Sequence, residues 1–245
     1  MTLSPRLQAV LDFCQDGFLV DSDSMHQNHV KSPLHNPDCG ILADIGTDHA
    51  YLPIAAVRQG ICGGAIACDL HPGPLAMADE NIRGAGLEGQ IETRLGDGLT
   101  PLGPGEADCI VIAGMGGMRI WGIILEGMEQ ARAAKRLILQ PQHDIVLLRK
   151  NLHGAGFEIQ GERLVREVVG GKEHFYVVLV ARYTGDVAAW TEREYFLGKF
   201  LIERGGADFS AYVAHEREKI SNYVSSINDK NLLCDVQQRL DWLTI

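Results

Sequence analysis

The chain of 245 residues lacks any apolar run of the length that crosses a membrane, about 18 residues or more, so no transmembrane helix is expected. Its first residues form an amphipathic segment with no small-residue cleavage pattern, and we expect no signal peptide. Internal repeats and low-complexity tracts are also missing. These absences favour a cytoplasmic globular protein with one large domain, or one domain and a small appendage.

Cysteine is scarce and scattered. The six cysteines form no C-x-x-C pair, and several lie in apolar runs, which favours a reduced protein without structural zinc. His26, His29, His35 and Cys39 share one polar stretch, but their spacing matches no zinc pattern, so we expect no metal. Three other histidines are interpreted as loop or surface residues: His71, His143 and His153.

Positive charge is also in short supply. The chain has 22 Lys and Arg against 32 Asp and Glu, and a net charge of -10 argues against a nucleic-acid partner. The balance is uneven, because residues 1–118 are strongly acidic while residues 119–172 carry nine Lys and Arg against six Asp and Glu. Basic side chains of this middle segment form either a solvated face or an RNA-binding surface. They are Arg132, Lys135, Arg136, Arg149, Lys150, Arg163 and Arg166.

From Gly40 onwards, short apolar strands alternate with helices of about 10–15 residues, which predicts a doubly wound, largely parallel α/β sheet. The last two strands have no helix between them, which suggests a hairpin and hence an antiparallel edge strand. The predicted strands are 41–45, 65–70, 91–99, 107–117, 136–141, 157–168 and 174–183. The predicted helices between them are 51–60, 74–86, 119–131 and 144–156.

Other segments flank this pattern. Residues 4–14 have helical spacing, and the polar residues 15–39 are interpreted as a flexible insertion. Residues 190–245 have helical spacing interrupted at Gly205 and Gly206, which favours a small helical hairpin or coiled coil. The expected domains are a Rossmann-like catalytic domain over 1–185 and a helical domain over 186–245.

Residues suited to ligand binding follow the strands, at the edge where an open α/β sheet binds its ligands. The turn D-I-G-T-D-H-A-Y-L-P (44–53) has one glycine, and its acidic residues suit an ammonium group and repel phosphate. The dinucleotide fingerprint G-x-G-x-x-G is missing, which disfavours a nicotinamide dehydrogenase. The alternative is an ordinary strand-to-helix turn with polar residues on the surface.

Three later strand ends carry weaker signals. Asp69 suits a ribose diol, or alternatively caps the following helix. Asp97 and Gly98 in G-D-G suit an adenine ring, although such a tripeptide is a common turn. The glycine-rich loop A-G-M-G-G (113–117) brings backbone groups against a ligand. Each signal is weak alone, and their order along the chain makes them stronger.

Together, these blocks resemble the bacterial tRNA adenine-N1-methyltransferases, which methylate adenine 22 of tRNA. The shared blocks are L-S-x-R-L near the start, A-D-I-G-T-D-H-A-Y-L-P, the G-P after Asp69, G-D-G-L, I-A-G-M-G-G and L-I-L-Q-P, in order from Leu3 to about Tyr183. The resemblance implies a Rossmann-like class I methyltransferase domain, S-adenosyl-L-methionine as methyl donor, tRNA as partner, and a helical C-terminal domain that helps hold tRNA.

The resemblance also implies roles for individual residues. Asp48 is the candidate catalytic residue, because a carboxylate would stabilise the cationic product ring. The N1 lone pair of adenine is free, so catalysis would rest on positioning, with Tyr51 or Met115 either stacking on the base or serving only in packing. The expected cofactor-binding residues are Asp44, Gly46, Asp48, His49, Asp69, Asp97, Gly98, Ala113, Gly114, Met115 and Gly116.

Two other functions stay open. The acidic composition favours a methyltransferase of a small molecule or protein side chain. A Rossmann-like protein that binds a nucleotide without catalysis is the third reading. A basic patch beside the cofactor cleft, formed by residues 119–172, would favour tRNA. We expect a monomer.

Overall fold

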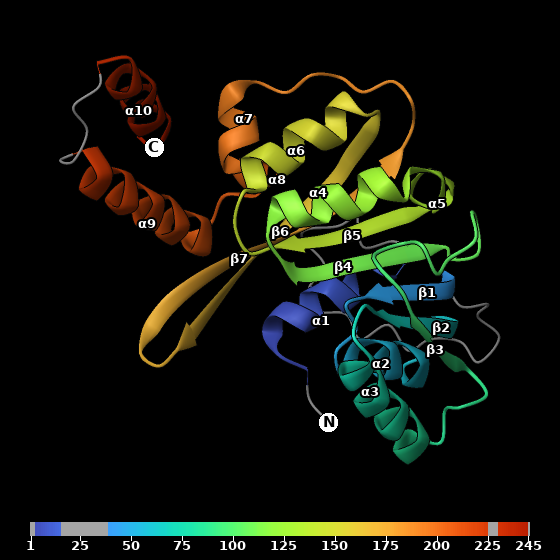
Figure 1. Ribbon diagram of the computed structural model, residues 1–245. Helices are drawn as coiled ribbons and strands as arrows, with labels where there is room; N and C mark the ends of the chain where they lie inside the picture. The colour runs from blue at the N-terminus through green and yellow to red at the C-terminus, as the bar shows by residue number, and fades with distance from the viewer. Residues whose placement is uncertain (1–2, 16–38, 225–229, 245) are drawn as a thin grey trace.

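The computed structural model describes residues 3–15, 39–224 and 230–244 (Figure 1), so most of the predicted insertion at 15–39 lies outside the described residues. At its centre is a sheet of five parallel strands followed by an antiparallel hairpin. In spatial order the strands are β3 (Ile91–Leu95), β2 (Cys62–Asp69), β1 (Cys39–Ile45), β4 (Cys109–Met115), β5 (Arg136–Pro141), β7 (Lys172–Tyr183) and β6 (Phe157–Val169). The predicted α/β sheet is confirmed.

The predicted antiparallel edge strand is wrong in its position. β7 pairs antiparallel with both β5 and β6, so the reversed strand lies inside the sheet and β6 forms its edge. β7 contributes Val178 and Val180 to the core on one face of the sheet, and Leu179 and Ala181 to the core on the other. A strand that is apolar on both faces is stabilised more by an inner position than by an edge.

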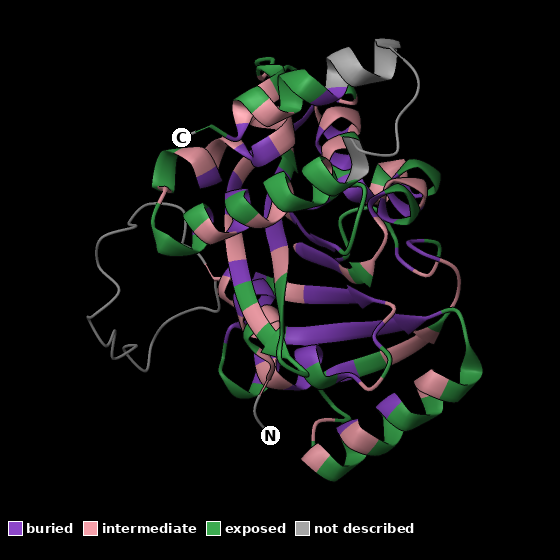
Figure 2. Ribbon diagram, turned by 90° about the vertical axis from the view of Figure 1, so that its left-hand side faces the viewer, coloured by how far each residue is buried: buried purple, intermediate pink, exposed green. Residues whose placement is uncertain are grey.

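Helices cover both faces of the sheet (Figure 1). Strand residues alternate between the two cores, with Leu42 and Val111 facing one and Ala43 and Ile112 facing the other. The buried strands at the centre of Figure 2 are the result. The first core includes α1 (Pro5–Asp12), α2 (Tyr51–Arg58) and α3 (Pro72–Ala85). The second core includes α4 (Gly117–Glu126), α5 (Met128–Ala133) and α6 (Ile145–Gly154).

Two predicted helices are interrupted at glycines. The helix predicted over 119–131 is divided at Gly127, where a Cβ would lie 2.4 Å from the Cβ of Leu99. The first predicted C-terminal helix is divided at Gly198, whose φ is +95°. The predicted break at Gly205 and Gly206 is confirmed. The C-terminal helices are α7 (Glu192–Leu197), α8 (Lys199–Arg204), α9 (Ala207–Val224) and α10 (Lys230–Trp242).

The C-terminal helices pack on the hairpin of β6 and β7. A third apolar cluster joins Val177 of β7 to Leu201 of α8, Phe209 of α9 and Leu243 after α10. The ring of Phe196 on α7 also lies 5.8 Å from that of Trp242. Within the described ranges, no helix is both long and apolar enough to span a membrane.

Candidate functional site

The turn after β1 is fixed to the two neighbouring strands. The N–H groups of Gly46 and Thr47 both donate to the carbonyl of Cys68 at 2.9 Å, which ties the turn to the end of β2. Gly46 has φ +75°, and a Cβ there would lie 2.5 Å from the terminal methyl of Met115 at the end of β4. Glycine is therefore required here both by the backbone and by the close approach of Met115.

Asp44 is a buried carboxyl group at the end of β1. Among the described residues, the Thr47 hydroxyl donates a hydrogen bond to the Asp44 carboxylate at 2.8 Å. Burial raises the pKa of Asp44 to about 6; the Thr47 hydrogen bond opposes this rise and the charge of Asp69 adds to it. No basic side chain among the described residues pairs with Asp44, so a cation at this position would favour its ionised form.

Asp69 ends β2 and is also buried. Its carboxylate accepts hydrogen bonds from the N–H of His71 at 2.9 Å and from the N–H of Asp48 at 3.4 Å. The alternative reading of Asp69 as the N-cap of the next helix is wrong, because His71 is the N-cap residue of α3. Asp69 instead links the ends of β1 and β2.

The turn continues through strained backbone into α2. Asp48 and Ala50 have φ of +54° and +57°, a region unfavourable for residues with a side chain. The Asp48 side chain is 69% exposed and its carboxylate lies 3.5 Å from Nε2 of His49. The other ring nitrogen of His49, Nδ1, is buried and has no hydrogen-bond partner in the described part of the chain. Such strain and an unpaired buried polar atom are typical of ligand sites.

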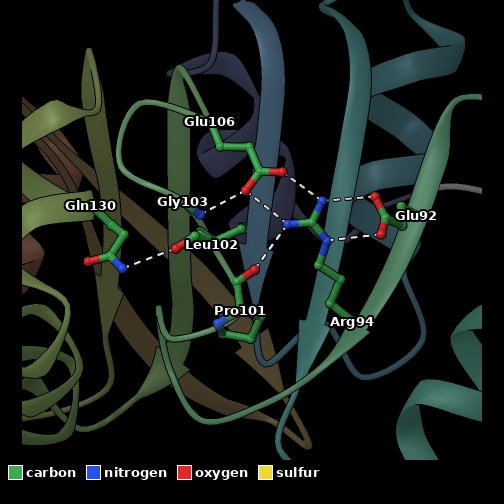
Figure 3. A network of polar contacts seen from close by, with 7 residues as sticks. All are labelled: Glu92, Arg94, Pro101, Leu102, Gly103, Glu106 and Gln130. Carbon is green, nitrogen blue, oxygen red and sulfur yellow. Dashed lines mark hydrogen bonds and ion pairs between the residues drawn. The ribbon is translucent and has the colours of Figure 1, made fainter.

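The loop after β3 is held by Arg94, as Figure 3 shows. The guanidinium pairs with Glu92 at 2.9 Å and with Glu106 at 2.6 Å, and donates to the Pro101 carbonyl at 3.0 Å. The hydrogen bonds from Arg94 are the main cause that lowers the pKa of Glu106 to about 2. This network fixes both ends of the segment that carries Asp97 and Gly98.

Within that loop, Asp97 pairs with Arg119 of α4 at 3.0 Å, and both side chains are largely exposed. Gly98 has φ +53°, and a Cβ there would lie 3.0 Å from a methyl of Ile123. The predicted cofactor residues therefore gather at one edge of the sheet, in four loops that contact one another through Gly46 with Met115, Asp48 with Asp69, and Asp97 with α4.

The end of β4 and the start of α4 pack against the end of β5 and the loop that follows it. The N–H of Gly114 in β4 donates to the side-chain oxygen of Gln140 in β5 at 3.1 Å, and the N–H of Gly117 at the start of α4 donates to the carbonyl of His143 at 2.9 Å. Neither His143 nor Asp144 belongs to a predicted cofactor motif. The one sequence signal near them is L-I-L-Q-P, which immediately precedes this loop.

The basic residues of 119–172 are dispersed over the fold. Arg149 is completely buried and pairs with the equally buried Glu162 at 2.7 Å, so it forms neither a solvated face nor an RNA-binding surface. Lys135 and Lys150 pair with Asp108 and Glu192. Arg163 and Arg166 line a groove of about 540 Å³ between α1, β6, α8 and α9, together with Arg204.

Four residues of the polar stretch are of types that bind metals. His26, His29 and His35 lie outside the described residues, and Cys39 is buried at the start of β1. In residues 3–15, 39–224 and 230–244, His, Cys, Asp and Glu form no group of three or more that would hold a metal ion.

Comparison with known sequences identifies relatives along most of the chain. A family model described as tRNA (adenine(22)-N(1))-methyltransferase matches residues 42–242. A Bacillus subtilis (strain 168) protein named tRNA (adenine(22)-N(1))-methyltransferase is 34% identical over 218 residues, which cover 84% of this chain and 90% of the relative.

Solved structures are similar over the same extent. The B. subtilis M1A22 tRNA methyltransferase is 30% identical with a TM-score of 0.79, and the match covers 99% of this chain and 97% of that one. Streptococcus pneumoniae Sp1610, solved in complex with S-adenosyl-L-methionine, is 30% identical with a TM-score of 0.81 and complete coverage of both chains. Both matches extend through the C-terminal helices.

Proposed function

We propose that this chain, which belongs to the tRNA (adenine(22)-N(1))-methyltransferase family, transfers a methyl group from S-adenosyl-L-methionine to N1 of adenine 22 in tRNA. The observation that carries the proposal is the pair of buried carboxyl groups, Asp44 and Asp69, that stand without a basic partner among the described residues at the sheet edge. Since tRNA is the substrate, we place the activity in the cytoplasm.

The residues at this edge fit the methyl donor. S-adenosyl-L-methionine supplies a methyl group on a positively charged sulfur, and as the new N1–carbon bond forms, the sulfur keeps the electron pair of the broken bond. Asp44 suits the cationic methionine portion, and Asp69 suits the ribose hydroxyls. Asp97 and Gly98 would hold the adenine ring. The remaining cofactor contacts would come from Gly46, Asp48, His49, Ala113, Gly114, Met115 and Gly116.

The target adenine would lie at the loop after β4. Asp48 is our candidate for the carboxylate that stabilises the charge on the methylated ring, because its exposed side chain stands on the strained turn after β1. N1 needs no deprotonation, so the side chains act by orientation and electrostatics. The N1 edge is hidden in paired RNA, so the base must be splayed out of its stack.

For the tRNA backbone, we propose the groove lined by Arg163, Arg166 and Arg204. The pairing of Leu139 with Leu179, and of Val177 with Leu164, puts this part of β6 level with the end of β5. Arg204 has no acidic partner among the described residues. Burial and the charge of Arg163 lower the pKa of Arg204, so a bound anion would oppose both effects by stabilising the charged guanidinium.

The test is transfer of labelled methyl from the donor to unmodified tRNA, followed by nucleoside analysis. We expect 1-methyladenosine from the wild type and none when position 22 carries guanine. Asp69→Ala should abolish donor binding and transfer together. Asp79→Ala is the matched control, because Asp79 is an exposed carboxylate on α3 whose partner is Thr93.

Two results would contradict the proposal in different ways. If the protein binds the donor and methylates no tRNA, the acceptor is a small molecule or a protein side chain. If the protein does not bind the donor at all, a nucleotide-binding role without catalysis is the better description.

A further inference from the structure

The loop after β5 has backbone strain like that of the turn after β1. Among the described residues, three non-glycine residues have positive φ, and two of them, Asp48 and Ala50, lie in the turn after β1. The third is Asp144, with φ +58°, which is the N-cap residue of α6. Strained backbone of this kind persists where the surrounding structure enforces it, and it clusters at functional sites.

Gly116 gives a second, independent indication. Its φ of -65° and ψ of 146° are open to any residue, so the backbone does not explain the glycine. A Cβ at this position would lie 2.4 Å from Cε1 and 2.7 Å from Nε2 of His143. The imidazole therefore occupies the space beside Gly116, against the loop where the proposed function places the target base.

The orientation of the imidazole is fixed from the other side. Nδ1 of His143 lies 2.7 Å from a carboxylate oxygen of Asp144, and the two side chains are 69% and 41% exposed. In the neutral tautomer whose Nδ1–H donates to Asp144, the lone pair of Nε2 is an acceptor. Backbone hydrogen bonds from Gly117 to His143 and from Gln142 to Met115 hold the two loops together.

The Watson–Crick edge of adenine offers a matching donor. Its N6 amino group stands next to N1, and methylation of N1 spreads positive charge onto N6. We propose, resting on the function above, that Nε2 of His143, oriented by Asp144, accepts a hydrogen bond from the N6 amino group of the target adenine. The proton stays on N6 throughout. Because this hydrogen bond strengthens as charge develops, it favours the transition state over the bound substrate.

The test measures single-turnover methylation with saturating donor and two RNA substrates. One carries adenine at the target position and the other carries purine, which lacks the amino group. We expect His143→Ala to slow methylation of the adenine RNA about 10- to 100-fold, the effect of losing a hydrogen bond to a charged group. On the purine RNA, the same variant should be as fast as the wild type. His143→Gln, whose amide oxygen can accept a hydrogen bond, should recover part of the rate.

Three controls separate this contact from a structural role. Donor affinity and urea unfolding of His143→Ala should match the wild type, and His174→Ala, at an exposed histidine on the hairpin, should keep full activity. Equal losses on both RNAs, or no loss on the adenine RNA, overturn the contact while the proposed function stands. A wild type that forms no 1-methyladenosine overturns both.

Discussion

The two halves of the sheet differ in whether their buried carboxyl groups have a basic partner. At the ends of β1 and β2, Asp44 and Asp69 are buried with hydroxyl and N–H donors around them and no basic partner in the described structure. On β6, Glu162 is just as buried, but it meets Arg149 at 2.7 Å. A carboxylate with a matched cation in the fold holds elements together, whereas one without it is available to a cationic ligand.

Removing one partner of the matched pair should have the largest effect on stability. Arg149 also donates to the carbonyls of Tyr195 and Phe196, so it joins α6, β6 and α7. We expect Arg149→Met to lower the free energy of unfolding by about 3–5 kcal/mol, because it leaves the Glu162 charge buried alone. Urea unfolding measures this. The double variant Arg149→Met with Glu162→Met should recover most of the loss, and no recovery would contradict the pairing.

The unmatched carboxyl group should make stability depend on pH in the opposite sense to an ion-paired one. The folded-state pKa of Asp44 is about 6, against about 4 in an unfolded chain, so the folded protein holds an extra proton between these values. Its contribution to the free energy of unfolding therefore falls by up to about 3 kcal/mol as the pH rises from 4 to 7. Asp44→Asn should lose this slope and be the more stable protein at pH 7. The measurement is urea unfolding of both proteins without donor across that range, and parallel curves would contradict it.

The smallest effect on stability is expected at the exposed ion pairs of the groove. Arg166 pairs with Glu173 and Asp208, and all three side chains are at least one-third exposed. Arg166→Ala should change the free energy of unfolding by less than about 1 kcal/mol. It should weaken tRNA binding and reduce the slope of log affinity against log salt by about 1, if the groove holds a phosphate. An unchanged salt slope would exclude Arg166 from the RNA contact.

Local signals predicted that the candidate cofactor residues follow strand ends, and the fold brings these strand ends together at one edge of the sheet. Gly46 and the acidic residues around it mark a strand end in one short turn, so their position follows from nearby sequence alone. The burial of Arg149 was not predicted, because its partner Glu162 lies on another element and the local sequence does not show that the two pair. His143 was missed because its environment depends on the absence of a side chain at Gly116, 27 positions earlier. The hairpin itself was predicted, but nothing local specifies which of its strands pairs with β5.

That pairing sets an order of assembly. β5 ends at Pro141, and its open edge is covered by β7, which begins at Lys172. β6 is synthesised between these two strands but pairs only with β7, at the edge of the sheet. During synthesis, β5 leaves the ribosome well before residues 179–181 of β7, which pair with it, so the edge of the parallel half stays open in that interval. In that interval, β5 presents unpaired backbone groups to any other strand, so a pause in synthesis after β5 has emerged and before β7 has emerged would be the moment when this chain is most prone to associate with itself.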